Sequence, residues 1–209
     1  MTGRLLCGLA AVAALAAGCS AGMAAPAGPA IVTSPAAQGA YQGLPLDPPQ
    51  PRPTFTLTDT SGQRYDFAAR TRGKPTFLFF GFTHCPDICP TTMADVAAAL
   101  RGVPDQVRRS VQVVFVTTDP ARDTGKVIAA WLRNFDDGLP NGFVGLTGTV
   151  AQVEGAQAAA RVPVATDGGQ THSAQLLLYG PDDYARVSYL AGSSPDDIRR
   201  DLPRVVKGS

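Results

Sequence analysis

The stretch "PTFLFFGFTHCPDICPTTMADVAAALRGV", residues 75–103, decides the fold that we expect for this chain. It begins with the continuous apolar run 75–82, which is typical of a strand covered on both faces of a sheet. It ends with 90–103, whose amphipathic pattern predicts a helix. The loop between them carries Cys85 and Cys89. The expected local structure is therefore a strand, a loop with two thiols, and a helix.

The rest of the chain continues this alternation of short apolar runs and longer amphipathic stretches. Further strands are expected at 54–59 and 111–118, and a hairpin at 174–180 and 185–192, around the turn signal "PDD". Further helices are expected at 124–135, at 149–162, and from Pro195 onward with Ser194 as the N-cap. The pattern predicts an α/β domain with helices packed on a central sheet.

The position of the two cysteines, at the expected start of a helix, affects how readily their thiols lose a proton. A thiol at a helix N-terminus meets unpaired N–H groups and the positive end of the helix dipole, both of which favour the thiolate. With three residues between Cys85 and Cys89, the thiols are expected about one turn apart on one face, where they can converge.

Three interpretations of this pair remain open from the residues alone. A structural disulfide is possible in an exported protein, but so short a loop gives it little stabilising effect. A thiol-disulfide oxidoreductase usually has two residues between its cysteines, and here there are three. A soft-metal site for Cu(I) or Zn(II) requires a third ligand from elsewhere.

The chain has two histidines that bear on this choice. If strand alternation continues into the loop, His84 points away from the site that Cys85 faces, so we expect it at the surface or behind the site. His172 stands just before the strand expected at 174–180. Its own context leaves its role open.

The N-terminus predicts export. Residues 1–18 combine Arg4 with an apolar run that is shorter than the about 20 residues needed to cross a bilayer. Gly18 followed by Cys19 resembles the bacterial lipoprotein box, which implies lipidation of Cys19 and anchoring on the extracytoplasmic side of the bacterial cell membrane. Ordinary signal-peptide cleavage nearby is the alternative.

Composition divides the remaining chain. Residues 19–51 are rich in Ala, Pro and Gly, so we expect a disordered tether without secondary structure before Arg52. Residues 52–207 fit one domain. The formal net charge is +1 and the sequence has no basic block, which argues against a nucleic-acid partner.

Four motifs, in this order and at these separations, resemble the Sco/SenC family of copper proteins: "GFTHCPDICPTTM", "VFVTTDPARDT", "FVGLTG" and "THSAQLLLY". The resemblance implies a thioredoxin-like fold with a central mixed sheet, flanking helices, and a C-terminal hairpin and helix. It also implies a copper ion, Cu(I) or Cu(II), bound by Cys85, Cys89 and His172. The family's D-P-x-R-D-T stretch falls on 119–124, with no ligand role implied.

The resemblance further implies a function. Members of the family assemble the dinuclear copper centre of cytochrome c oxidase, by delivering copper to the copper-bearing subunit or by reducing its cysteines. We therefore expect a copper chaperone that is not an enzyme, with that subunit as partner and other copper chaperones or thiol reductases as further partners. The alternative is a thiol-disulfide oxidoreductase that uses Cys85 and Cys89 on client proteins outside the cytoplasm.

Overall fold

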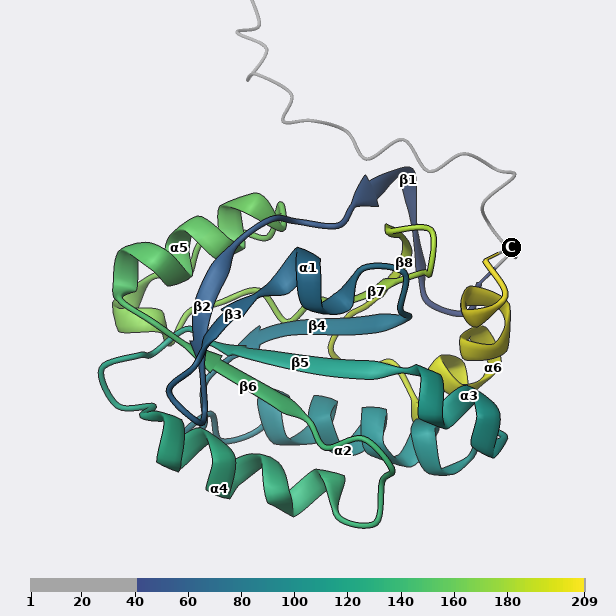
Figure 1. The fold of residues 1–209 in the computed structure, drawn as a ribbon, viewed down its shortest axis with the longest axis horizontal. Helices are drawn as coiled ribbons and strands as arrows, with labels where there is room; N and C mark the ends of the chain where they lie inside the picture. The colour runs from purple at the N-terminus through teal and green to yellow at the C-terminus, as the bar shows by residue number, and fades with distance from the viewer. Residues whose placement is uncertain (1–40, 209) are drawn as a thin grey trace, which may run out of the picture. The chain divides into compact units, whose positions relative to one another are not determined.

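A mixed sheet of eight strands runs through residues 41–208, the part of the chain that this computed structural model describes (Figure 1). Its strand order is β1-β8-β7-β4-β5-β6-β2-β3, with β4, β5 and β6 parallel and every other pair antiparallel. The strands are β1 (Leu44–Pro51), β2 (Thr56–Asp59), β3 (Arg64–Asp66), β4 (Thr76–Gly81), β5 (Gln112–Thr117), β6 (Val144–Thr147), β7 (Leu176–Tyr179) and β8 (Tyr184–Tyr189).

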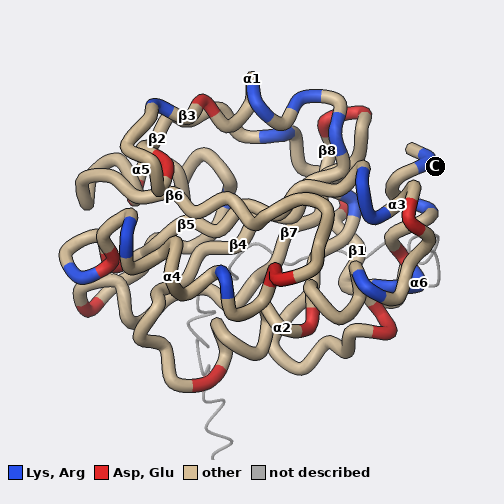
Figure 2. Tube along the Cα trace, turned by 60° about the horizontal axis from the view of Figure 1, so that its bottom comes forward, with Lys and Arg blue, Asp and Glu red and all other residues tan. Residues whose placement is uncertain are grey.

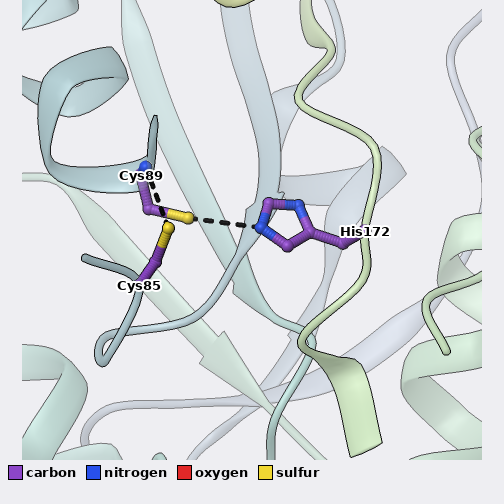
Figure 3. A group of neighbouring side chains, drawn as sticks. All are labelled: Cys85, Cys89 and His172. Carbon is purple, nitrogen blue, oxygen red and sulfur yellow. Dashed lines mark hydrogen bonds between the residues drawn. The ribbon is translucent and has the colours of Figure 1, made fainter. Parts of the chain in front are cut away.

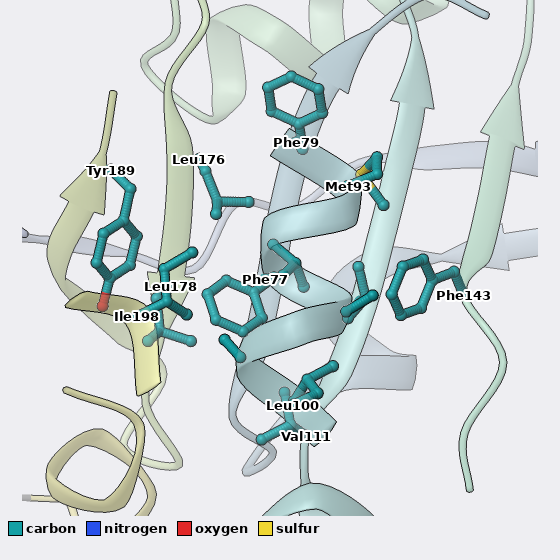
Figure 4. Close-up of a cluster of buried hydrophobic side chains, with 14 of the residues drawn as sticks. Phe77, Phe79, Met93, Leu100, Val111, Phe143, Leu176, Leu178, Tyr189 and Ile198 are labelled. Atoms are coloured by element: carbon teal, nitrogen blue, oxygen red, sulfur yellow. The ribbon is translucent and has the colours of Figure 1, made fainter. Parts of the chain in front are cut away.

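Helices cover both faces of this sheet. They are α1 (Phe67–Thr71), α2 (Ile88–Arg101), α3 (Asp105–Ser110), α4 (Gly125–Asp136), α5 (Val150–Ala159) and α6 (Pro195–Val206). Along β4, Phe77 and Phe79 pack on one face with α2, α4 and α6 (Figure 4), and Leu78 and Phe80 pack on the other with α1 and α5. All four side chains are fully buried, as expected of a strand that is covered on both sides.

Most of the predicted elements are confirmed, with shifts of one to a few residues at their ends. The strand–loop–helix unit is β4, the thiol loop and α2, which begins two residues earlier than expected. The hairpin is β7 and β8. The last helix has Ser194 as its N-cap and Pro195 in its first turn, and Asp197 completes a capping box.

The prediction of no secondary structure before Arg52 is wrong. Residues 44–51 form β1, which pairs with β8 at the edge of the sheet. The proline-rich composition that argued against order is compatible with an edge strand, because proline has no N–H to donate and an edge strand has positions where no N–H donor is needed. The domain therefore begins before residue 44, and only part of the range 19–51 can be a tether.

The expected signal peptide and Cys19 lie outside the described residues. Within residues 41–208, no helix has both the length and the apolar character needed to cross a membrane.

The described chain begins at the end of the sheet that is remote from the thiol loop. Tyr41 lies beside Gly180, just past the end of β7, and Tyr179 pairs with Thr76 at the start of β4. The thiol loop follows Gly81 at the opposite end of β4. The thiol loop and Tyr41 therefore lie at opposite ends of the sheet.

Candidate metal centre

Cys85, Cys89 and His172 bring three donor atoms together at the end of β4 (Figure 3). The donors lie within 4.8 Å of one another, and the Cys89 Sγ is 3.4 Å from the His172 Nε2. Three ligands that bind one ion at about 2.0–2.3 Å are separated from each other by roughly 3.5–4 Å. Only a small adjustment would thus let all three bind a single ion.

The His172 ring is oriented by its own backbone. Its Nδ1 lies 2.9 Å from the Ser173 carbonyl oxygen, which can only accept, so Nδ1 carries the hydrogen. The Nε2 lone pair is then directed at the thiols, as in metal-binding histidines whose second nitrogen is hydrogen-bonded. The ring also packs edge-on against Phe82 and Phe79, with centroids 5.5 and 6.3 Å away.

The two thiols differ in environment, which the sequence did not show. Burial raises the pKa of Cys89, whose side chain is inaccessible to solvent. Burial also acts to raise the pKa of the partly exposed Cys85, but backbone N–H groups of Asp87, Cys89 and Ile88 outweigh it, and this pKa lies below its ordinary value.

The expectation of two helix-terminal thiols on one face is therefore only half right. Cys85 precedes α2, and only Cys89 lies in its first turn. The Cys89 backbone N–H is 3.4 Å from the Cys85 Sγ, so the loop folds Cys85 back over the helix end. The helix terminus favours the thiolate at Cys85, whereas burial in the metal-free protein favours the thiol at Cys89.

Asp123 fixes the thiol loop to the neighbouring strand. Its fully buried carboxylate accepts hydrogen bonds from the Thr83 backbone N–H at 2.9 Å, the Thr83 hydroxyl at 2.5 Å and the Thr117 hydroxyl at 2.7 Å. Thr117 is the last residue of β5, and Thr83 lies two residues before Cys85. Asp123 thus positions the cysteines without being one of the three donors.

The loop that carries His172 is fixed to the same strand end. The Thr118 hydroxyl donates to the Gly169 carbonyl at 2.6 Å. Gly169 has a φ of +89°, and a Cβ there would lie 1.8 Å from the Thr118 carbonyl oxygen, so only glycine permits this contact. Both ligand loops therefore rest on residues 117–118.

His84 lies outside the group of donors, as expected. Its side chain is 55% exposed, and its Nδ1 lies 3.1 Å from the Thr83 hydroxyl and 3.5 Å from an Asp123 oxygen. Gly81, by contrast, was not singled out from the sequence. A Cβ at this position would lie 2.7 Å from the Cys89 Sγ, so the last residue of β4 has to be small for the sulfur to sit where it does.

Asp123 and Thr118 are the functional residues that the sequence did not reveal as such. A usable signal was present, because "VFVTTDPARDT" follows a strand predicted to be buried on both faces. Parallel neighbouring strands bring their carboxyl ends to one edge, where such residues meet the thiol loop.

The donor set fits a soft metal ion. Two thiolates and one imidazole suit Cu(I) or, with an added ligand, Cu(II), and also resemble sites used for Zn(II). A hard ion such as Mg²⁺ or Ca²⁺ would require oxygen ligands, and this group offers none.

Comparison with known proteins places these features in one family. Residues 45–207 match the family described as SCO1/SenC. A protein of Stutzerimonas stutzeri named "Putative copper-binding protein" is 35% identical over 161 residues, which cover 74% of this chain and 76% of that protein. For the mitochondrial SCO proteins of yeast, cattle, human, Arabidopsis and mouse, the match covers between 31% and 61% of their length.

Solved structures agree with the fold. Bradyrhizobium japonicum ScoI, solved with copper bound, is 31% identical, with a TM-score of 0.61 over 74% of this chain and 99% of that chain. BsSco, described as a member of the Sco family of cytochrome c oxidase assembly proteins, is 22% identical, with a TM-score of 0.60 over 80% of this chain and 98% of that chain. The predicted thioredoxin-like α/β fold is confirmed.

Proposed function

This chain belongs to the SCO1/SenC family, and we propose that it binds one copper ion through Cys85, Cys89 and His172. We further propose that it delivers this copper to the dinuclear centre of cytochrome c oxidase, or prepares the cysteines of that centre. The observation that carries the proposal is the convergence of two sulfurs and one oriented imidazole nitrogen at the end of β4. The copper-bound structure of a relative 31% identical supports it.

The asymmetry of the thiols suits a site that both holds and releases its cargo. Cys89 is buried beneath the site, and Cys85 is partly exposed at its rim. An incoming client thiolate can reach the copper from the Cys85 side and replace the protein's ligands one at a time. The site also lies at the opposite end of the sheet from Tyr41, where the described chain begins.

Reduced protein is expected to bind one copper ion per chain. The Cu(II) form should show an intense thiolate-to-copper charge-transfer band in the visible, because two sulfurs lie in the ligand set. Titration of the metal-free protein with Cu(I) and with Cu(II), followed by absorption spectroscopy, measures both. A stoichiometry well below one, or a Cu(II) spectrum without a sulfur band, contradicts the proposal.

A second candidate function is thiol-disulfide exchange, and the same asymmetry favours it. The Cys85 thiol has a lowered pKa and is accessible, as an attacking thiol should be, and Cys89 is buried next to it, as a resolving thiol often is. This activity would use the cysteine pair as a redox couple and would not need His172. The variant His172→Ala therefore separates the two functions.

We also propose that the mature protein is anchored by a lipid on Cys19, facing the extracytoplasmic side. The support is the short apolar run from Leu5 to Ala17, which is followed directly by Gly18 and Cys19. One acyl chain alone binds membranes only marginally, so a stable anchor requires the two or three chains of a mature lipoprotein.

Mass spectrometry of the mature N-terminal peptide is expected to show a diacylglyceryl-modified Cys19 as its first residue, and the protein should fractionate with membranes. The variant Cys19→Ala should lose both properties. An unmodified cysteine, or cleavage at another position, would show that the anchor is wrong and leave the copper site unaffected.

A further inference from the structure

A groove of about 260 Å³ opens directly beside the metal centre. One wall is the first half of α2 with its preceding residue, and the other is the turn 190–193 between β8 and α6. The floor is apolar and consists of Leu176, Tyr189 and Ile198, which lie together in Figure 4. Ile88, in the α2 wall, directly precedes the ligand Cys89, so whatever occupies the groove lies next to the site.

The groove presents apolar side chains that the fold itself does not cover. Ile88 is 37% exposed and Leu190 is 52% exposed, although both are large and apolar. The Tyr189 hydroxyl donates to Asp201 at 3.0 Å, so its polar end is already satisfied and its ring faces the groove as an apolar surface. Exposed apolar groups gathered beside a functional site mark a surface for binding.

The charges of the groove have one sign. Asp87 and Asp95 line it, and no Lys, Arg or His of the described residues 41–208 does. Burial raises the pKa of Asp95, and no nearby cation in the described part of the chain offsets this effect. Elsewhere on the surface, charges of both signs are interspersed (Figure 2), and acids such as Asp105 and Asp182 form ion pairs with neighbouring arginines. Asp95 is therefore a partly buried acid beside the apolar floor, and within residues 41–208 it has no ion-pair partner.

We propose that this groove docks an extended segment of the client protein that combines one large apolar side chain with a Lys or Arg. The apolar side chain lies between Ile88 and Leu190, and the basic residue pairs with Asp95. From Ile88 to Asp95 the helix rises about 10 Å, which an extended segment covers in about three residues. The apolar and basic residues of the client should therefore stand about three positions apart.

The inference rests on the proposed function, because it takes the client to be a protein that receives copper or electrons at Cys85 and Cys89. Docking beside the ligands would hold the client's thiols near Cys85 while exchange takes place. Because the groove is small, the complex is expected to be transient, as in other encounters that bury little surface.

The test measures binding between two proteins of the same organism. One is the full chain, reduced and loaded with copper, and the other, used as the probe, is the soluble copper-binding domain of the oxidase subunit. The dissociation constant is measured at low salt for Asp95→Lys and for Leu190→Ser. The matched controls, both on α5, are Glu154→Lys and Val150→Ser. Glu154 is exposed and forms no ion pair with any described residue, and Val150 is apolar and 57% exposed. All four variants should retain one copper ion per chain and the thermal stability of the wild type within a few degrees.

Each groove variant is expected to raise the dissociation constant at least tenfold, and each control to change it less than twofold. Raising the salt concentration should weaken the wild type more than Asp95→Asn, since only the wild type has the screened ion pair. Groove variants that bind like the wild type overturn the docking proposal. The absence of any complex between the wild type and the probe also overturns it. A third contrary result is a wild-type dimer in analytical ultracentrifugation that Leu190→Ser dissociates, because the occupant of the groove would then be a second copy of this chain.

These outcomes are distinguishable from failure of the proposed function, which is judged by whether the wild type binds copper and loads the probe's copper centre. Loading without a groove-dependent complex leaves the proposed function standing and removes the groove from it. A complex that depends on the groove, in which no copper is loaded into the probe, supports docking in the groove and contradicts the proposed function.

Discussion

Replacing His172 with alanine is expected to lower the affinity for Cu(II) by more than about 100-fold, since loss even of a residue that only supports a metal ligand typically costs 10–100-fold. The substitution removes the only nitrogen of the three donors, 3.4 Å from the Cys89 Sγ. Cu(I) should lose less, because two thiolates can hold it in low coordination, whereas Cu(II) requires more ligands. Competition titrations with chelators of known affinity for each oxidation state measure both effects.

The fold should survive this change. His172 lies in a loop that precedes β7, and its ring contacts Phe82 and Phe79 at its edge, so truncation is expected to cost less than about 2 kcal/mol of the free energy of unfolding. The disulfide between Cys85 and Cys89 should still form and be reduced. The control is His84→Ala, which removes the chain's other histidine from an exposed position and should bind copper like the wild type.

The same variant separates the two candidate functions in cells. If copper delivery is the function, His172→Ala should fail to support oxidase assembly under limiting copper. Full oxidase activity in spite of lost copper binding would contradict the chaperone proposal and favour thiol-disulfide exchange, which depends on Cys85 and Cys89 alone.

Replacing Asp123 with alanine is expected to lower the free energy of unfolding of the metal-free protein by about 3 kcal/mol. The change removes the acceptor of the Thr83 N–H and of the Thr83 and Thr117 hydroxyls, and buried donors left without partners cost about 1–3 kcal/mol each, less where a hydroxyl can rotate to another acceptor. For a domain of this size, that loss corresponds to a decrease of roughly 6–12 °C in the melting temperature. Urea and thermal denaturation measure it.

Copper binding should weaken as well, because Thr83 is two residues from Cys85 and loses its attachment to β5. The control Asp123→Asn keeps the size of the side chain and one acceptor oxygen, so its stability and copper affinity should lie between those of the wild type and the alanine variant. If Asp123→Ala unfolds like the wild type, the carboxylate does not hold the loop in the way its hydrogen bonds indicate.

Local pattern was sufficient to predict the elements that carry the site. The continuous apolar run at 75–82 predicted a strand covered on both faces, and the structure confirms it, with Phe77 and Phe79 in one apolar layer and Leu78 and Phe80 in the other. The hairpin of β7 and β8 and the capped start of α6 follow from turn and capping residues that act over a few positions.

Local pattern was misleading where long-range pairing decides the structure. Residues 44–51 carry the composition of a tether, yet they form β1 because the edge of β8 offers them hydrogen-bonding partners some 140 positions away. Composition indicates whether a segment can form stable structure by itself. It failed here because β1 is stabilised by pairing with β8.

By itself, the sequence determined that two thiols lie between a buried strand and the first turn of a helix, and its family resemblance named His172 as their partner. Only the tertiary structure brings the imidazole, 83 positions beyond Cys89, to 3.4 Å from the sulfur. It does so because Thr117 and Thr118, at the end of β5, bind both ligand loops, through Asp123 on one side and Gly169 on the other. The tertiary structure also shifts the pKa values of the two thiols in opposite directions, because burial depends on what packs over each sulfur. The periodicity of the sequence does not show that packing.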